Sequence, residues 1–248
     1  MLEIKNLSKY YSDQYGNKVK LFTNISFTIE EGKITSVIAP VGSGKTSLLK
    51  IISRLENPTE GEILVNGNGK IIYIPPEPSS FPWLSVKENV VFALNSYSTE
   101  KISEIINIVG LEGYSDHYPD DNSLGFRFRI ALARSLAHNP KCICIDEPFN
   151  KMDLITKLEL YQLLRKIKNE LKTTILFTTT NITEAILLSD RIYLMGKEPA
   201  SIFEALQIEI DDPRDLIIVN SEKFNNYIHI IENHFKQIDG QKILFKTI

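Results

Sequence analysis

The sequence has little cysteine, no long apolar run and no excess of charge of one sign. Only two of its 248 residues are cysteines. Cys142 and Cys144 stand two positions apart in an apolar run, so we expect both on one face of a buried strand, reduced as in the cytosol. Its apolar runs are strand-length, far short of the roughly 20 residues that cross a membrane. A formal net charge of -3 excludes the global basic field typical of nucleic-acid-binding proteins.

Internal repeats, low-complexity segments and long linkers are also absent. Residues 1–5 alternate as a strand does and do not form a signal peptide. Hydrophobic residues make up 43% of the chain and charged residues 24%, which is typical of a soluble globular protein. The length suits one large α/β domain, or one core with an inserted subdomain.

One stretch, residues 39–47, organises the rest of the chain. It reads Ala-Pro-Val-Gly-Ser-Gly-Lys-Thr-Ser and lies between an apolar run at 34–38 and a helical pattern at 48–55. Strand, glycine loop and helix in that order indicate a phosphate-binding loop. Gly42 and Gly44 allow successive backbone N–H groups to face one anion, and the helix adds its positive N-terminal end.

Lys45 and Thr46 give this loop its chemistry. We expect the Lys45 ammonium to reach the β- and γ-phosphates of a nucleotide and the Thr46 hydroxyl to bind Mg²⁺. The predicted nucleotide-binding residues of the stretch are Pro40, Val41, Gly42, Ser43, Gly44, Lys45, Thr46 and Ser47. Ala39 stands where the pattern usually begins with glycine, and it fits only with an ordinary β or α backbone. A plain turn between strand and helix is the alternative, which the placement of Gly-Lys-Thr disfavours.

A second apolar run, at 141–145, ends in Asp146 and Glu147. Ligands of open α/β sheets bind at the carboxyl ends of the strands. We expect Asp146 to bind Mg²⁺, directly or through water, and Glu147 to be the catalytic carboxylate that positions the attacking water. Alone, this pair would be interpreted as capping acids at a strand end. Together with Lys45 and Thr46 it predicts a phosphate site.

The remaining pattern predicts an α/β fold with a mostly parallel sheet covered by helices. The expected strands are 2–7, 21–29, 62–65, 70–74, 173–178, 191–195 and one near 201–210, and the expected core helices are 152–171, 182–188 and one near 222–235. The strands at 62–65 and 70–74 flank an Asn-Gly turn and predict a hairpin. Helical patterns at 86–94, 102–109 and 125–137 follow a proline-rich loop, and they predict an inserted helical subdomain.

The order of these motifs resembles the ATP-binding subunits of ABC transporters over nearly the whole chain. The resemblance rests on Tyr11, 39–47, 81–90, 129–134, 146–149, Asp153 and 184–192. The segments at Pro82–Trp83 and 184–192 look most like the nitrate/sulfonate/taurine importer branch. The family fold is a P-loop nucleotide-binding core with an antiparallel β layer and an inserted α-helical subdomain. On this pattern the core is 1–75 and 139–212, the helical subdomain 76–138, and 213–248 a C-terminal extension.

The resemblance implies an ATPase that energises import of a small anion, with ATP and Mg²⁺ as cofactors. Binding of Mg-ATP would close a dimer, and hydrolysis would reopen it. The implied partners are a second ATP-binding subunit, an integral membrane permease reached by loop 75–83, and indirectly an extracytoplasmic substrate-binding protein. The chain would lie on the cytoplasmic face of the membrane. In this family pattern Tyr11 stacks on the base, and Asp153 lies at the dimer seam.

Three positions depart from the family pattern. The signature Leu-Ser-Gly-Gly, followed by Gln or a similar residue, is replaced by Asn-Ser-Leu-Gly-Phe at 122–126. Ser123 and Gly125 are expected to contact the ATP of the partner subunit, whereas Leu124 replaces a glycine. Pro76 aligns with the loop glutamine and has neither a side-chain amide nor a backbone N–H. Thr180 aligns with the switch histidine and is expected to contact ATP through a shorter, uncharged side chain.

These departures leave two interpretations open. The chain is an active ATPase with ordinary sequence drift, or it binds ATP well and hydrolyses it slowly alone. An alternative function is a degenerate regulatory or structural subunit in a heterodimer with a hydrolysis-competent partner. A soluble ATPase acting on nucleic acid or ribosomes is disfavoured because the chain has no coiled-coil insertion and no basic block.

Overall fold

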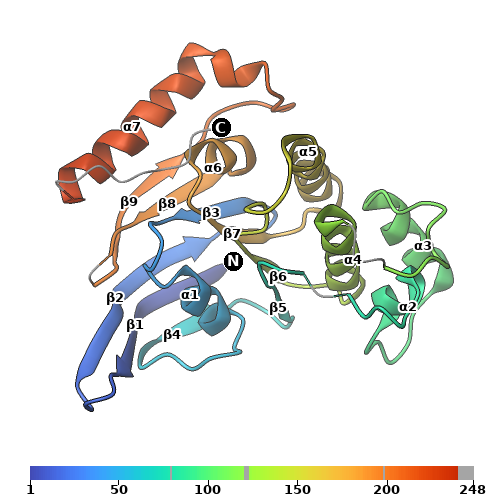
Figure 1. The fold of residues 1–248 in the computed structure, drawn as a ribbon, viewed down its shortest axis with the longest axis horizontal. Coiled ribbons are helices and arrows are strands. Elements are labelled where there is room, and N and C mark those ends of the chain that lie inside the picture. The colour runs from blue at the N-terminus through green and yellow to red at the C-terminus, as the bar shows by residue number, and fades with distance from the viewer. Residues whose placement is uncertain (79, 120–122, 198, 240–248) are drawn as a thin grey trace.

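The structure, a computed structural model, describes residues 1–78, 80–119, 123–197 and 199–239 (Figure 1). Its strands are β1 (Leu2–Ser12), β2 (Lys18–Ile29), β3 (Ile34–Ile38), β4 (Glu60–Val65), β5 (Ile71–Ile74), β6 (Cys142–Asp146), β7 (Ile175–Thr179), β8 (Arg191–Met195) and β9 (Ile202–Gln207). Its α-helices are α1 (Lys45–Ile52), α2 (Val86–Val91), α3 (Thr99–Ile108), α4 (Leu124–Ala137), α5 (Leu154–Leu171), α6 (Ile182–Leu188) and α7 (Glu222–Asp239). They build two sheets and an outlying helical group.

The larger sheet has the strand order β5-β6-β7-β3-β8-β9. Neighbouring strands run parallel from β5 through β6, β7 and β3 to β8, and β9 pairs antiparallel with β8. Strands β3, β6 and β7 are mostly apolar, and they are buried along their whole length, as central parallel strands are. Their carboxyl ends meet at one edge of the sheet. The α/β fold with a mostly parallel sheet is confirmed.

The smaller sheet, β2-β1-β4, is antiparallel and forms the expected antiparallel layer. The hairpin predicted from 62–65 and 70–74 is wrong, because β4 pairs with β1 whereas β5 pairs in parallel with β6. The turn between them, with Gly67 at φ 83°, carries the chain from one sheet to the other. Strand β5 places apolar side chains on both faces of the larger sheet. The burial of these side chains, rather than the turn before the strand, therefore determines which sheet β5 joins.

Alternation along β6 sorts its side chains onto the two faces of the larger sheet. Cys142 and Cys144 are buried and free, and they face the core that α1 shares with the smaller sheet. Ile143 and Ile145 face the core formed with the helices on the other side. The prediction that both cysteines share one face of a buried strand is confirmed. Helix α1 therefore lies between the two sheets, directly after the loop that begins at the end of β3.

The proline-rich loop is fixed to the helical group by one buried amide, that of Asn89 in α2. Its Oδ1 accepts a hydrogen bond from the Phe81 N–H at 2.8 Å. Its Nδ2 lies 2.9–3.0 Å from the carbonyl oxygens of Phe81, Leu84 and Ser85, which share its two N–H bonds. Arg134 of α4 donates to the same Oδ1 at 2.8 Å. A buried amide with every partner satisfied stabilises one conformation of the loop over alternatives.

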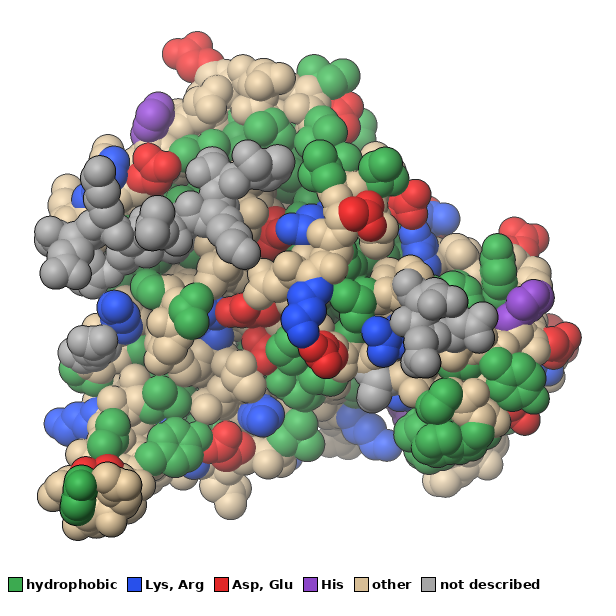
Figure 2. All heavy atoms as spheres, viewed as in Figure 1, with side chains coloured by type: hydrophobic (Ala, Val, Ile, Leu, Met, Phe, Trp, Pro, Cys, Tyr) green, Lys and Arg blue, Asp and Glu red, His purple; other side chains and the backbone are tan. Residues whose placement is uncertain are grey.

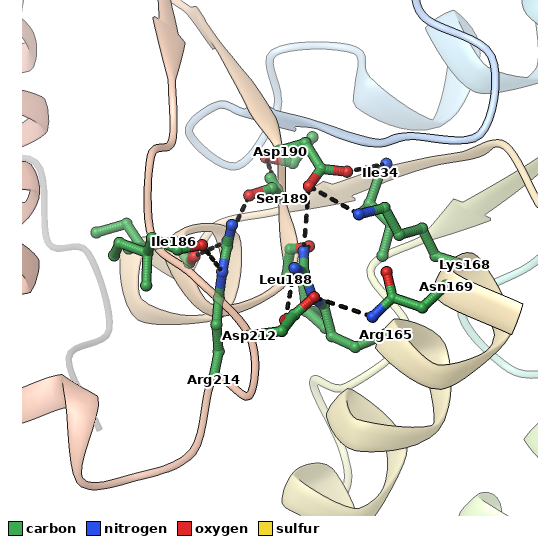
Figure 3. Close-up of polar contacts among 12 residues, drawn as sticks. Ile34, Arg165, Lys168, Asn169, Ile186, Leu188, Ser189, Asp190, Asp212 and Arg214 are labelled. Carbon is green, nitrogen blue, oxygen red and sulfur yellow. Dashed lines mark hydrogen bonds and ion pairs between the residues drawn. The ribbon is translucent and has the colours of Figure 1, made fainter. Parts of the chain in front are cut away.

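A buried polar network fastens the segment after β9 to the core (Figure 3). Arg165 of α5 donates to Asp212 Oδ1 from Nη2 at 2.6 Å and from Nε at 2.9 Å, and it lies 3.4 Å from Asp190. Arg214 donates to backbone carbonyls at the C-terminal end of α6. Burial, together with the neighbouring Arg165, lowers the pKa of Arg214 to about 10. The chain thus leaves the sheet in a fixed direction and places α7 over β8 and β9 (Figure 1).

The surface shows no broad field of one charge over the described residues on the face in Figure 2, where acidic and basic side chains are interspersed. On this face the distribution agrees with the small net charge of the chain. Within the described ranges, no helix is both long and apolar enough to span a lipid bilayer.

Candidate active site

The predicted phosphate-binding loop, residues 39–44, connects the end of β3 to the start of α1. Gly42 and Gly44 have φ angles of 85° and 88°, in the left-handed region that side chains disfavour. At Gly44, a Cβ atom would also lie 2.7 Å from Leu21 Cγ. The curled backbone therefore requires both glycines. Ala39 is buried and is not among the described residues with positive φ, so it has the ordinary backbone that alanine needs.

Lys45 is turned back into the loop. Its Nζ donates to the carbonyl oxygens of Ala39 and Pro40, both at 2.9 Å, and lies 2.9 Å from Glu147 Oε1. Only 4% of the Lys45 side chain is exposed, against 21% for Glu147. Three acceptors occupy the three N–H bonds of the ammonium. A bound phosphate has to replace one of them, and Glu147 is the only one that belongs to a side chain.

Ser43 is the other polar group enclosed by the loop. Its hydroxyl is buried and has no hydrogen-bond partner. A buried polar group left unpaired costs about 1–3 kcal/mol. An anion bound by the loop would supply acceptors for this hydroxyl and for the neighbouring backbone N–H groups. Thr46 follows at the start of α1 with an exposed side chain, and Val41 and Gly42 are also exposed.

Asp146, the last residue of β6, is completely buried and accepts hydrogen bonds from both neighbouring strands. Thr178 of β7 donates to Oδ1 at 2.8 Å, and Tyr73 of β5 donates to Oδ2 at 3.0 Å. Burial, with the charge of Asp146, raises the pKa of Tyr73, so this phenol remains a donor. The sequence predicted Asp146 but neither hydroxyl partner.

Glu147 follows with φ 41°, a left-handed conformation that is uncommon for a residue with a side chain. Its N–H lies near both the carbonyl and the hydroxyl of Thr178, at 3.2 and 3.3 Å. Its second carboxylate oxygen accepts a hydrogen bond from Asn150 Nδ2. Thr178 thus bonds both the Asp146 carboxylate and the Glu147 backbone, and the backbone turn directs the Glu147 carboxylate toward Lys45. Asn150 and Thr178 carried no recognisable signal in the sequence.

The oxygen donors in this region suit Mg²⁺. Among the described residues, no group of three or more His, Cys, Asp or Glu side chains is arranged to hold a metal ion. Mg²⁺ is usually bound by one or two protein oxygens together with waters and substrate phosphates. The Thr46 hydroxyl and the Asp146 carboxylate, beside a phosphate-binding loop, are a donor set of that kind.

Tyr11, near the end of β1, lies against α1. Its hydroxyl is 3.1 Å from Ser47 Oγ and donates to Glu56 at 2.5 Å. Lys9 pairs with Glu56 at 2.8 Å, and its ammonium lies 5.1 Å from the centre of the Tyr11 ring. Burial and the hydrogen bond to Glu56 raise the pKa of Tyr11. The hydroxyl is therefore anchored while 43% of the residue stays exposed, which leaves a ring face for stacking.

A model of the ABC transporter family matches residues 22–150, the segment that contains the glycine loop and both carboxylates. The chain belongs to this family. It is an ATP-binding subunit of an ABC transporter, an ATPase whose activity is coupled to transport.

Known members of the ABC transporter family cover almost all of the chain. It is 39% identical over 232 residues to the aliphatic sulfonates import ATP-binding protein SsuB of a Bacillus cereus strain, a match covering 90% of this chain and 91% of that protein. It is 36% identical over 228 residues to the ABC transporter ATP-binding protein MJ0412 of Methanocaldococcus jannaschii, covering 86% and 84%. The dimeric post-hydrolysis structure of the cassette MJ0796 with ADP and Pi superposes with TM-score 0.72 at 28% identity, covering 85% of this chain and all of that one.

The segment expected to correspond to the ABC signature, around Ser123 and Gly125, lies apart from the glycine loop within one chain. Ser123 accepts a hydrogen bond from the Phe126 N–H at 3.3 Å and caps α4, and Figure 1 shows α4 well separated from α1. Gly125 is buried, and a Cβ there would lie 2.6 Å from Thr156 Cγ2 of α5. This glycine is therefore required by packing within the chain, whatever else it contacts. Asn122 lies outside the described residues.

The other two residues expected to depart from the ABC pattern, Pro76 and Thr180, are exposed and half-buried. Pro76 is exposed in the loop after β5. Glu77 next to it forms an exposed ion pair with Lys151, which lowers the pKa of Glu77. Thr180 is half-buried at the bend after β7. Its neighbour Thr179 donates to Glu184 at 2.7 Å instead, so this bend is fixed from within the core.

Asp153, the residue expected at the dimer seam, caps α5. Its carboxylate accepts from the Thr156 N–H at 2.9 Å and from the Thr156 hydroxyl at 2.6 Å. These hydrogen bonds lower the pKa of Asp153, and the side chain remains exposed. Helix α5 thus starts two residues later than the pattern from 152 suggested.

Proposed function

We propose that this chain is the ATP-binding subunit of an importer for aliphatic sulfonates or a related small anion such as nitrate or taurine. The observation that carries the proposal is the contact of Lys45 with Glu147 at the mouth of the glycine loop, in a chain 38–39% identical to four Bacillus proteins named as sulfonate import subunits. The ATPase chemistry follows from this site, whereas the substrate class is inferred from the relatives.

In the proposed reaction, each residue at this edge of the sheet has a separate role. Lys45 turns from Glu147 to the β- and γ-phosphates of ATP, and the N–H groups of 41–46 surround them. Thr46 and Asp146 would hold Mg²⁺, which neutralises phosphate charge when bound. Glu147, released from Lys45, is then free to accept a proton from the attacking water and to orient it. Tyr11 would stack on the adenine.

We further propose that the subunit works as a dimer in which each ATP lies between the glycine loop of one copy and α4 of the other. Ser123 and Gly125 would contact the ATP of the partner, and Asp153 would lie at the seam. The separation of α4 from α1 in one chain supports this arrangement, as does the likeness to two dimeric structures of the cassette MJ0796. Thr180 would contact the γ-phosphate from its own chain.

The face toward the membrane permease is proposed to be the loop 75–83 with the helical subdomain, 76–138. Trp83 is 71% exposed, and its ring packs 5.6 Å from Phe81, which packs 4.4 Å from the exposed Phe92. Exposed aromatic side chains of this kind mark contact sites. A cavity of about 280 Å³, lined in part by Pro75 and Arg134, lies beside them. The subunit would thus lie peripherally on the cytoplasmic face of the membrane. The other parts of the chain would be the core of 1–75 and 139–212 and the C-terminal extension at 213–248.

The test is transport-coupled hydrolysis in the assembled system. The chain is co-purified with an integral membrane permease encoded beside it, reconstituted in liposomes with the matching binding protein, and assayed for ATPase activity with and without alkanesulfonates. We expect sulfonates to stimulate hydrolysis, and Lys45→Ala to abolish it. Stimulation by another small anion, with none by any sulfonate, would refute the substrate class. Absence of assembly with the permease would refute the importer function.

A further inference from the structure

Both oxygens of the Asp146 carboxylate are fixed, each by a hydroxyl from a different strand. Thr178 acts from the centre of the larger sheet, and its register partner on β6 is Asp146 itself. Tyr73 acts from the edge: β5 pairs only with β6 among the described strands. Two hydrogen bonds to the two oxygens fix the rotation of a carboxylate about its terminal bond. The direction in which Asp146 presents its remaining lone pairs is therefore set partly by an edge strand.

Strand β5 ends at Ile74 and continues directly into the proline-rich loop. Pro76 in that loop has no amide with which to reach the site, and Glu77 is engaged with Lys151 on the surface. Tyr73, three positions before Pro76, is the residue of this segment whose side chain does contact the site. Its ring is half-buried at the sheet edge, between the cavity beside α4 and a second one of about 440 Å³ beside the end of α1.

We propose that Tyr73 is a positioning residue for Mg²⁺: its hydroxyl orients Asp146 toward the metal, and it gives strand β5, which leads directly into the permease-facing loop, a hydrogen bond to the metal site that Pro76 cannot make. The inference rests on the proposed function, because it takes Asp146 as a ligand of Mg²⁺ bound with ATP. Removing a hydrogen-bond partner that orients a metal ligand typically costs about 10–100-fold in metal affinity or activity.

The test compares Tyr73→Phe with Tyr193→Phe. Tyr193 is a buried tyrosine of the same sheet whose hydroxyl bonds to Thr28, in the smaller sheet, so its variant is a matched loss of one hydroxyl. ATP binding to the full-length chain is measured by calorimetry in excess Mg²⁺ and in EDTA. The ratio of the two dissociation constants reports how strongly the metal contributes to binding.

We expect Tyr73→Phe to reduce this ratio about tenfold or more, with little change in EDTA, while Tyr193→Phe keeps the wild-type ratio. In ATPase assays, Tyr73→Phe should raise the Mg²⁺ concentration for half-maximal rate more than it lowers the rate at saturating Mg²⁺. Melting temperatures establish that both variants are folded.

The possible results distinguish the positioning role of Tyr73, the metal role of Asp146 and the proposed function. An unchanged ratio in Tyr73→Phe, or equal weakening of binding with and without Mg²⁺, would refute the positioning role and leave a structural tyrosine. A wild-type chain that binds ATP without any effect of Mg²⁺ would refute the metal role of Asp146 and this inference with it. A wild-type chain that binds no ATP at all would refute the proposed function itself.

Discussion

Replacing Glu147 with glutamine should tighten ATP binding to the isolated chain. Lys45 is almost fully buried, and it pairs with Glu147 at 2.9 Å while also bonding two backbone carbonyls. ATP must take Lys45 away from Glu147, and the Glu147 carboxylate also repels the incoming phosphates. Glu147→Gln keeps a neutral acceptor in the same place and removes the charge, so it lowers the cost of releasing Lys45.

The size of this effect follows from the contact that changes. Both glutamate and glutamine accept a hydrogen bond from the charged Lys45 ammonium, so the exchange removes only the ion-pair part of the contact. An exposed ion pair contributes about 0.2–1 kcal/mol, and this pair is more enclosed, so we expect the pairing to weaken by roughly 1 kcal/mol. Since 1.4 kcal/mol corresponds to a factor of ten, ATP should bind about fivefold more tightly. At the same time turnover should be lost and the closed dimer should live longer, because the carboxylate that we propose as catalytic is gone.

Calorimetry on the monomeric chain, at a protein concentration too low for dimerisation, measures the affinity without the contribution of the partner. The control is Glu159→Gln, which removes a carboxylate of an exposed pair with Arg129 on the outside of α5. It should leave ATP affinity unchanged. Unchanged or weaker ATP binding by Glu147→Gln would refute the view that the pair with Lys45 opposes ATP. Retained turnover would show that Glu147 is not the catalytic carboxylate.

Three further predictions concern the base, the loop and the departures from the family pattern. Tyr11→Ala should weaken ATP binding by the roughly 1–3 kcal/mol typical of base–aromatic stacking, and Tyr11→Phe should largely retain it; equal losses would contradict stacking. Asn89→Ala should leave several buried backbone groups unpaired, cost about 3 kcal/mol and lower the melting temperature by roughly 6–12 °C; an unchanged melting curve would contradict the role of the amide. Restoring glutamine at Pro76, glycine at Leu124 and histidine at Thr180 should raise ATPase activity, most of all together; a wild-type rate already at about 1–10³ s⁻¹ would show that these positions are not limiting.

The elements whose apolar patterns are long or regular could be predicted from the sequence. The runs that become β3, α6 and β8 have the bounds expected from periodicity and burial. The strands at 62–65 and 70–74 were correctly placed but wrongly paired, because an Asn-Gly turn indicates a tight turn without deciding which sheet each strand enters. That choice depends on which core receives Ile63 and which receives Ile74, and this is a property of the folded chain.

Some residues of the candidate site could likewise be predicted from the sequence, and others could not. Lys45, Thr46, Asp146 and Glu147 could be found because the loop and the strand end have fixed spacing. Tyr73, Thr178 and Asn150 could not, because their contacts depend on strand register and on the turn after β6. A tyrosine in an edge strand and a threonine in a buried strand are both common choices for packing alone. The requirement for glycine at 125 also arises from a neighbouring helix, not from the signature pattern.

The most direct test of the central claim, that the glycine loop and Lys45 form the ATP site, is calorimetric titration of the full-length chain with ATP and Mg²⁺. Lys45→Ala removes the buried ammonium that the loop encloses, which is the point charge that we propose pairs with the β- and γ-phosphates. The wild-type chain is predicted to bind one ATP per chain, and the variant to lose most of that affinity with its melting temperature preserved. Equal affinity of the two proteins for ATP would contradict the claim.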